Sequence, residues 1–354
     1  MKKIVFMFLA ALAICLPMQS FGAEKSVLDK VYRYVWSHYV LWEPWQYIAD
    51  SGIMKKWADK YGVKVEIVLI NDYVQSINQY TAGEVVGCAM TEMDALNMPA
   101  AGGVKSDILV VGDYSNGNDG IVLMNGKSLK DLIGRNSLIV QGSVSSYLQS
   151  RGVKLIGHKD SEVVEVNTSD ANIGAAFASS GSKGACVTWN PILMQVRNLP
   201  NATMVFDSSK IPGEIQDLMV VRSDAPDNVK KALVGAWYEA MTIMFGQGKQ
   251  TDEAIEIMAK SAGGTVAEFK AQLRTTYVYN KPADGVKFVE DPEVKRIIKE
   301  VAEFSFDHGL MGQNVRAATD VGVQFPDGTV YGNPKNVKLL YRSDYMKQAA
   351  AGGL

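Results

Sequence analysis

The stretch Tyr114-Ser115-Asn116-Gly117-Asn118-Asp119-Gly120-Ile121-Val122-Leu123-Met124 indicates how this chain of 354 residues is organised. Its first part is rich in Gly, Asn and Ser, which favour turns, and its last four residues are apolar, as in a buried strand. We interpret it as the point where the chain leaves one lobe and enters a second. A similar apolar run at residues 218–221 predicts the return.

On both sides of this stretch, short β-runs alternate with helical patterns, which is typical of an α/β protein with mainly parallel sheets flanked by helices. A helix is predicted from Pro44 to about residue 61, where Gly62 ends it. The other expected strands are residues 31–35, 63–70, 85–90, 108–111, 137–140, 163–166, 184–188 and 203–206. Long helical segments at about 226–246, 250–261, 265–273 and 291–309 are expected to pack on the first lobe.

Two crossings between two lobes predict a two-segment hinge, and proteins of this architecture close on their ligands by hinge motion. We expect residues 24–120 and 218–312 to form the first lobe and residues 121–217 the second. Residues 313–354 are expected to form a strap on the surface of the first lobe.

Residues 1–23 are predicted to be a signal peptide. Lys2 and Lys3 precede an apolar run at 4–16, and Phe21-Gly22-Ala23 ends on small residues that suit cleavage. We therefore expect a soluble periplasmic protein. Leu12-Ala13-Ile14-Cys15 faintly resembles a lipoprotein cleavage box, so anchoring through Cys15 remains the alternative.

Composition excludes several classes of function. With 36 basic and 38 acidic residues the chain is mildly acidic and has no basic stripe, which argues against nucleic acid as a partner. Three cysteines and three scattered histidines supply neither a disulfide framework nor a metal site, so we expect no metal and no cofactor. Cys88 and Cys186 lie in apolar runs and are expected to be buried free thiols.

Several motifs resemble the nitrate/taurine/sulfonate-type substrate-binding proteins of ABC transporters, beginning with Ser-Leu-x-Asp-Leu-x-Gly at 128–134. The strings that are similar to one branch of that group, named after the urea carboxylase gene region, are Asn71-Asp72-Tyr73, Gln79-Tyr80-Thr81-Ala82-Gly83, Met90-Thr91-Glu92-Met93-Asp94-Ala95-Leu96, Gly112-Asp113-Tyr114-Ser115-Asn116-Gly117-Asn118-Asp119, Val187-Thr188-Trp189-Asn190-Pro191, Phe206-Asp207-Ser208-Ser209-Lys210-Ile211-Pro212-Gly213-Glu214-Ile215 and Gly235-Ala236-Trp237-Tyr238-Glu239.

The resemblance implies a two-lobed periplasmic binding protein fold of type II-like topology, a monomer that docks on an inner-membrane ABC permease. For this branch it implies uptake of urea-like nitrogen compounds, with guanidine the better chemical candidate. Taurine- and sulfonate-type relatives commonly carry an acidic residue where Asn190 stands, which puts transfer of their ligand in doubt.

Ligands of open α/β lobes bind outside the carboxyl ends of the strands, so residues that follow strands are the candidates for the site. Trp36, Tyr39 and Trp42 follow the first strand and offer three rings that can stack on a flat ligand or attract a cation. The alternative is that one or two of these rings pack under the helix that begins at Pro44.

Acidic residues occur at two of these strand ends. Glu92 follows the third strand, where a carboxylate could accept two parallel N–H bonds from an amidinium-like group. Asp94 is expected to cap the short helix that follows. Asp119 lies at the first crossing. Its side chain either faces the ligand or forms hydrogen bonds with the backbone of its own turn.

Three further residues complete the predicted site. Ser143 precedes a helix and either binds a ligand or only caps that helix. Trp189 ends a strand at the family's usual ligand-facing position. The resemblance places the loop that holds Glu214, and with it Asp217, beside the cleft; a solvated charge is the alternative for both.

These residues favour a binding protein for a small, planar, nitrogen-rich cation, with no catalysis. A taurine, alkylsulfonate or nitrate ligand is the alternative, although a sulfonate site would want an arginine and neither Arg151 nor Arg197 directly follows a strand. A less favoured alternative is an enzyme of pyrimidine-precursor type on the same scaffold, which would need a nucleophile–base pair or a metal cluster. A non-transport sensor stays open as a third class.

Overall fold

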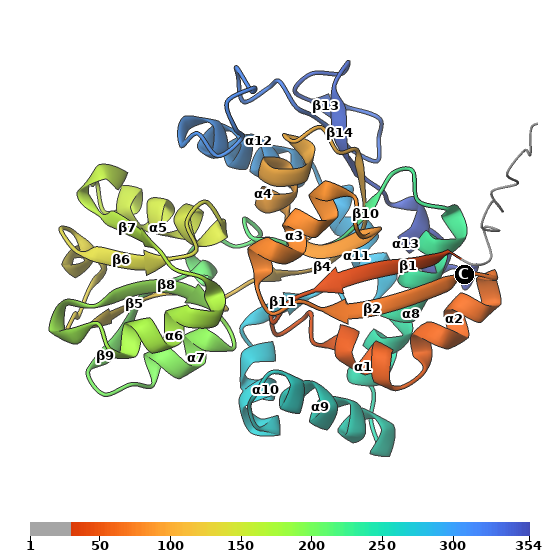
Figure 1. The fold of residues 1–354 in the computed structure, drawn as a ribbon, viewed down its shortest axis with the longest axis horizontal. Coiled ribbons are helices and arrows are strands. Elements are labelled where there is room, and N and C mark those ends of the chain that lie inside the picture. Colours follow the sequence, from red (N-terminus) through yellow and green to blue (C-terminus); the bar gives the residue numbers. More distant parts are fainter. Residues whose placement is uncertain (1–29) are drawn as a thin grey trace, which may run out of the picture.

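The structure is a computed structural model, and it describes residues 30–354. The predicted signal peptide and Cys15 therefore lie outside the described residues. The strands form two separate sheets, each flanked by helices, and Figure 1 shows them as two lobes side by side.

The larger sheet has nine strands in the order β13-β12-β14-β4-β10-β3-β1-β2, with β11 paired to β4. These strands are β1 (Val31–Trp36), β2 (Lys64–Leu69), β3 (Gly87–Thr91), β4 (Ser106–Ser115), β10 (Gln216–Arg222), β11 (Thr276–Val278), β12 (Gly322–Gln324), β13 (Val330–Tyr331) and β14 (Val337–Tyr341). The smaller sheet has the order β7-β6-β8-β5-β9, made of β5 (Asp119–Met124), β6 (Asn136–Ile139), β7 (Val164–Asn167), β8 (Ala185–Trp189) and β9 (Ala202–Asp207).

The α-helices are α1 (Pro44–Asp50), α2 (Ile53–Tyr61), α3 (Tyr73–Ala82), α4 (Glu92–Ala95), α5 (Val144–Leu155), α6 (Asp170–Ala178), α7 (Ile192–Arg197), α8 (Asp227–Met244), α9 (Lys249–Ser261), α10 (Val266–Leu273), α11 (Pro282–Val289), α12 (Pro292–Asp307) and α13 (Asp344–Ala350). The predicted helix from Pro44 to residue 61 is two helices, α1 and α2. Gly52 separates them with a φ of 79°, a conformation that glycine adopts without strain.

The sheets are mixed, whereas the sequence predicted mainly parallel ones. β1 pairs in parallel with β2 and β3, and β6 with β7 and β8. The strands next to the crossings break this pattern: β5 is antiparallel to β8 and β9, and β10 is antiparallel to β3 and β4. Each lobe thus takes an antiparallel strand into its sheet where the chain enters or returns.

The C-terminal segment is more than the surface strap that the sequence predicted. β14 pairs in parallel with β4, so β12, β13 and β14 extend the larger sheet at one edge. The chain then ends in α13, whose Tyr345 and Met346 are buried in the larger core.

Helix α12 packs on both lobes, whereas we expected it to pack on the first alone. Val294 and Ile298 belong to the core of the larger lobe. Phe304 instead stacks edge-on against Tyr147 of α5 with ring centroids 5.0 Å apart, and His308 Nε2 lies 2.8 Å from Asp160 Oδ2. The α12 end thereby ties the smaller lobe to the larger one.

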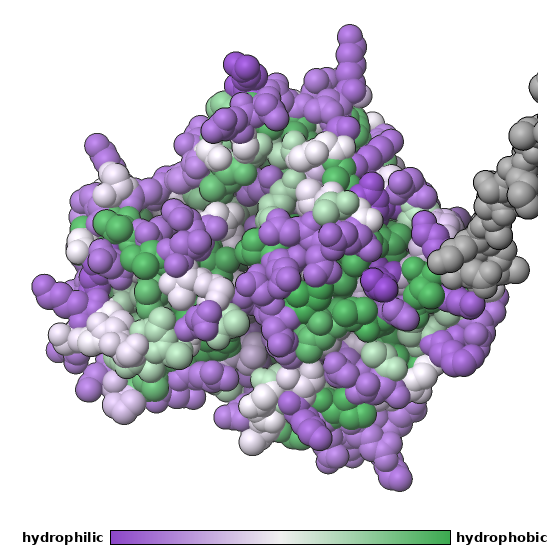
Figure 2. Space-filling view, viewed as in Figure 1, coloured by the Kyte–Doolittle hydropathy of each residue, from purple (hydrophilic) through white to green (hydrophobic). Residues whose placement is uncertain are grey.

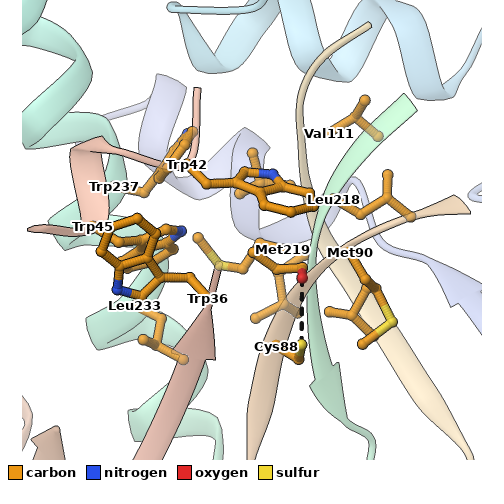
Figure 3. Close-up of a cluster of buried hydrophobic side chains, with 14 of the residues drawn as sticks. Trp36, Trp42, Trp45, Cys88, Met90, Val111, Leu218, Met219, Leu233 and Trp237 are labelled. Atoms are coloured by element: carbon orange, nitrogen blue, oxygen red, sulfur yellow. Dashed lines mark hydrogen bonds between the residues drawn. The ribbon is translucent and has the colours of Figure 1, made fainter. Parts of the chain in front are cut away.

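Tryptophans from distant segments gather in the larger core, as Figure 3 shows for Trp36, Trp42, Trp45 and Trp237. Trp36 is the last residue of β1 and is 1% exposed. Cys88 and Cys186 are buried free thiols, as the sequence predicted. No helix within residues 30–354 is long and apolar enough to cross a membrane, and polar and apolar groups are interspersed on the face in Figure 2.

We predict that Met346→Ala lowers the free energy of unfolding by about 2–5 kcal/mol, because Met346 is fully buried and its loss leaves a cavity. Its neighbour Lys347 is the matched control. Lys347 forms an exposed ion pair with Glu290, so Lys347→Ala should cost less than about 1 kcal/mol. Scanning calorimetry measures both; equal, small effects would show that α13 is only peripheral.

Candidate functional site

A closed cavity of about 10 Å³, with room for about one water molecule, lies between the two lobes. From the larger lobe and the crossing come Tyr39, Trp42, Tyr73, Thr91, Ile215 and Asp217, and from the smaller lobe come Asp119, Val144 and Trp189. Each lining residue is 5% exposed or less. A ligand could therefore enter only after the lobes separate.

Four rings, which we call the aromatic wall, line one side of the cavity: Tyr39, Trp42, Tyr73 and Trp189. Successive ring centroids are 5.2, 5.5 and 5.7 Å apart, within the range of favourable aromatic contacts. Trp189 comes from the other lobe, and its Nε1 donates a hydrogen bond to the carbonyl of His38 at 3.3 Å. The aromatic wall is complete only when the lobes are closed.

Carboxyl groups face the wall. Asp217 on β10 lies directly opposite Asp113 on β4 and opposite Thr91 on β3, so the strand register lines these three residues up across the sheet. Asp119, at the start of β5, is the cross-strand neighbour of Trp189. Asp113, Asp119 and Asp217 are at most 3% exposed.

Burial raises the pKa of each of these carboxyl groups, because an ionised carboxylate is poorly solvated there. The pKa of Asp119 rises to about 7. The pKa of Asp113 rises to about 8, and that of Asp217 lies well above its usual range, through burial and then repulsion from Asp113 and Asp119. The cluster is therefore held partly protonated near neutral pH.

A second space of about 10 Å³ lies behind Trp42 and shares Trp42 and Asp217 with the first. Four buried polar atoms of its lining residues have no hydrogen-bond partner: Tyr34 Oη, Trp237 Nε1, Asp113 Oδ2 and Asp217 Oδ2. Unpartnered buried polar atoms are rare in folded proteins.

The chemistry of these two spaces suits a small cation. Among residues 30–354, no Lys, Arg or His lines either space. Aromatic faces and carboxylates both attract positive charge, and carboxylates accept paired N–H bonds from a planar amidinium. No group of three or more His, Cys, Asp or Glu in the described part of the chain is arranged to hold a metal ion.

Of the site residues predicted from the sequence, the structure brings Tyr39, Trp42, Asp119 and Trp189 to the cavity. It places the others elsewhere. Trp36 packs in the larger core, and Glu92 accepts a hydrogen bond from the backbone N–H of Gln216 at 2.7 Å.

Ser143 and Glu214 also have structural partners. Ser143 caps α5 by accepting a hydrogen bond from the backbone N–H of Ser145. Glu214 accepts two hydrogen bonds from Arg151, at 2.8 and 2.9 Å, and one from the hydroxyl of Tyr147. It thus pairs with Arg151 rather than remaining a solvated charge.

We expected Asp94 to cap the short helix α4, but this prediction is wrong: Thr91 is the N-cap residue. Asp94 instead accepts hydrogen bonds from the hydroxyls of Thr91 and Tyr73, at 2.8 and 2.6 Å. These bonds fix the Tyr73 ring in the aromatic wall. Asn190, which replaces an acidic residue of taurine-type relatives, donates to Asn118 Oδ1 at 2.6 Å and does not line the cavity.

Sequence reasoning missed Tyr73 and Asp113, and it treated Asp217 only as a charge in the loop that also holds Glu214. Tyr73 is the first residue of α3, and Asp113 and Asp217 flank the two crossings. Their positions at strand ends were visible. Their proximity was not, because it depends on the register between β4 and β10.

No family model matches the sequence, and no curated protein matches it. Several solved structures are similar in fold. The alkanesulfonate-binding protein SsuA from Xanthomonas axonopodis pv. citri, bound to MOPS, superposes with a TM-score of 0.64 at 15% identity, over 81% of this chain and 96% of that one.

Two other solved structures are also similar in fold. The periplasmic aliphatic sulphonate binding protein SsuA from Escherichia coli has a TM-score of 0.62 at 16% identity, over 80% of this chain and 89% of its own. The periplasmic nitrate-binding protein NrtA from Synechocystis has a TM-score of 0.55 at 12% identity, over 90% of this chain and 98% of its own. These similarities confirm the predicted two-lobed periplasmic binding protein fold.

We predict that the unliganded protein loses stability as pH rises from about 4 to 8. The folded-state pKa values of Asp113 and Asp119, about 8 and about 7, exceed the unfolded value of about 3.9, so the folded protein holds protons that the unfolded chain releases. Each such group contributes up to about 1.4 kcal/mol per pH unit.

Scanning calorimetry across this pH range measures the effect. Asp113→Asn should flatten the pH dependence and leave the protein more stable than the wild type at pH 8, whereas the exposed control Asp327→Asn should not. An unchanged slope in Asp113→Asn would contradict the proposed protonation.

Proposed function

We propose that this protein is the periplasmic solute-binding component of an ABC importer, and that it captures a small, planar, nitrogen-rich cation of the guanidinium type by closure of its lobes. The observation that carries the proposal is the closed cavity between the lobes, where an aromatic wall faces buried carboxyls. The proposal includes export through the predicted signal peptide, a monomeric state and docking on an inner-membrane permease.

The size and closure of the cavity support a small ligand. The cavity of about 10 Å³ holds about one water molecule, so a ligand must displace lining side chains as the lobes close around it, and the buried lining leaves no room for a long substituent to reach solvent. A planar cation could lie against the aromatic wall while its N–H groups point to Asp119 and Asp217.

An anionic ligand is the second candidate, because the similar structures include alkanesulfonate- and nitrate-binding proteins. The carboxyl groups argue against it: a sulfonate or nitrate beside Asp119 and Asp217 would be repelled unless both were protonated. Arg151, the nearest arginine considered from the sequence, is paired with Glu214 and lines neither space.

A thermal-shift panel tests the ligand class. We expect guanidine or methylguanidine at millimolar concentration to raise the melting temperature, because a ligand at about 100 times its Kd stabilises the bound form by about 2.7 kcal/mol. Taurine, alkylsulfonates, nitrate and pyrimidine precursors should not. A shift with sulfonate or nitrate alone would overturn the cationic assignment.

Replacement of one ring tests the place of the site. Trp189→Ala should abolish the guanidine-induced shift, because it removes the ring that the smaller lobe contributes to the aromatic wall. The matched control is Trp57→Ala, since Trp57 lies on α2 away from the cavity and donates its Nε1 hydrogen to Glu239. A full guanidine response in Trp189→Ala would place the binding site elsewhere.

A further inference from the structure

The carboxyl pair of Asp113 and Asp217 carries an inference that rests on the proposed function and deepens it. The two residues are direct cross-strand neighbours on β4 and β10. Like charges directly opposite one another destabilise a sheet, and here both side chains are at most 3% exposed. Both residues line the same small space, where Oδ2 of each is buried without a hydrogen-bond donor from the described residues, and two carboxyl oxygens can share a hydrogen bond only if one of them carries a proton.

The groups that face this pair offer no positive charge. The titratable side chains near it are Tyr39, whose hydroxyl donates to Asp113 Oδ1 at 3.0 Å, and Tyr34, Glu92, Asp119 and Tyr279. Trp237 is the contribution of helix α8, and it is uncharged. All of these groups are neutral or acidic, so in the closed, unliganded site only protons can balance the charge.

We propose that Asp113 and Asp217 share a proton when the site is empty, and that a cationic ligand replaces this proton on binding. The exchange balances: the ligand brings one positive charge into the site, one carboxylic O–H bond breaks, and the proton leaves to solvent. The pair thereby selects cations over neutral molecules of the same shape.

The selection follows from electrostatics. A guanidinium ion beside Asp217 neutralises the repulsion between the two ionised carboxylates, so the site remains closed without the proton. Urea has nearly the same planar shape but no charge. It would have to bind with the proton retained and would leave the repulsion unrelieved.

Isothermal titration calorimetry of guanidinium chloride tests the exchange. Titrations are run at several values between about pH 6 and pH 9, in two buffers that differ in ionisation enthalpy. We expect release of about one proton per bound guanidinium near neutral pH. The affinity should rise with pH by up to tenfold per unit until the pair is ionised.

Substitutions at the two aspartates test whether the released proton comes from this pair. Asp113→Asn should abolish most of the proton release and flatten the pH dependence of affinity, and Asp217→Asn is a second variant with the same expected effect on proton release. The exposed carboxyl of Asp327 supplies the control, Asp327→Asn, which should release protons as the wild type does. Urea, if it binds, should release none.

The outcomes separate the two proposals. Guanidinium binding without proton release, or unchanged release in both Asn variants, would overturn the exchange and leave the cation-binding function intact. Absence of binding by any cation across the whole pH range would overturn the proposed function together with the exchange that rests on it.

Discussion

The burial of several carboxyl groups at the ends of strands β4, β5 and β10 is the constraint on which the site depends. Asp113 and Asp217 face each other across β4 and β10, and Asp119 approaches from the other lobe. Without a counter-charge, these groups must bind protons or force the lobes apart. In the proposed function, the counter-charge lies between the aromatic wall and these carboxyl groups, one of which accepts the hydrogen bond from Tyr39.

The antiparallel strands beside the crossings create this arrangement. β4 leads through residues 116–118 into β5, and β10 returns beside β4 in the opposite direction. Asp113, Asp119 and Asp217 therefore meet at the hinge although they come from different strands. Asn118, within the first crossing, donates a hydrogen bond to the Tyr39 hydroxyl and accepts one from Asn190, which couples the hinge to both sides of the cavity.

Much of the fold could be predicted from the sequence, because most strands and helices have local signals. The helix α8 (Asp227–Met244), expected at about 226–246, and the two-lobed α/β class follow from periodicity and turn residues. The residues of the site were harder to predict from the sequence. Tyr39 and Trp189 follow strands and reach the cavity, but Trp36 ends its strand with its ring in the core. Which face a terminal strand residue presents, and which carboxyls become neighbours, depends on long-range pairing that periodicity does not encode.

Helix α12 contacts both lobes and so affects how they can separate. Its first turns are embedded in the larger core, while Phe304 and His308 near its C-terminal end contact Tyr147 and Asp160 of the smaller lobe. Separation of the lobes would break the contacts of Phe304 and His308, because the first turns of α12 are packed in the larger lobe. The packing of α12 thus stabilises the closed arrangement of the lobes through contacts that no ligand supplies.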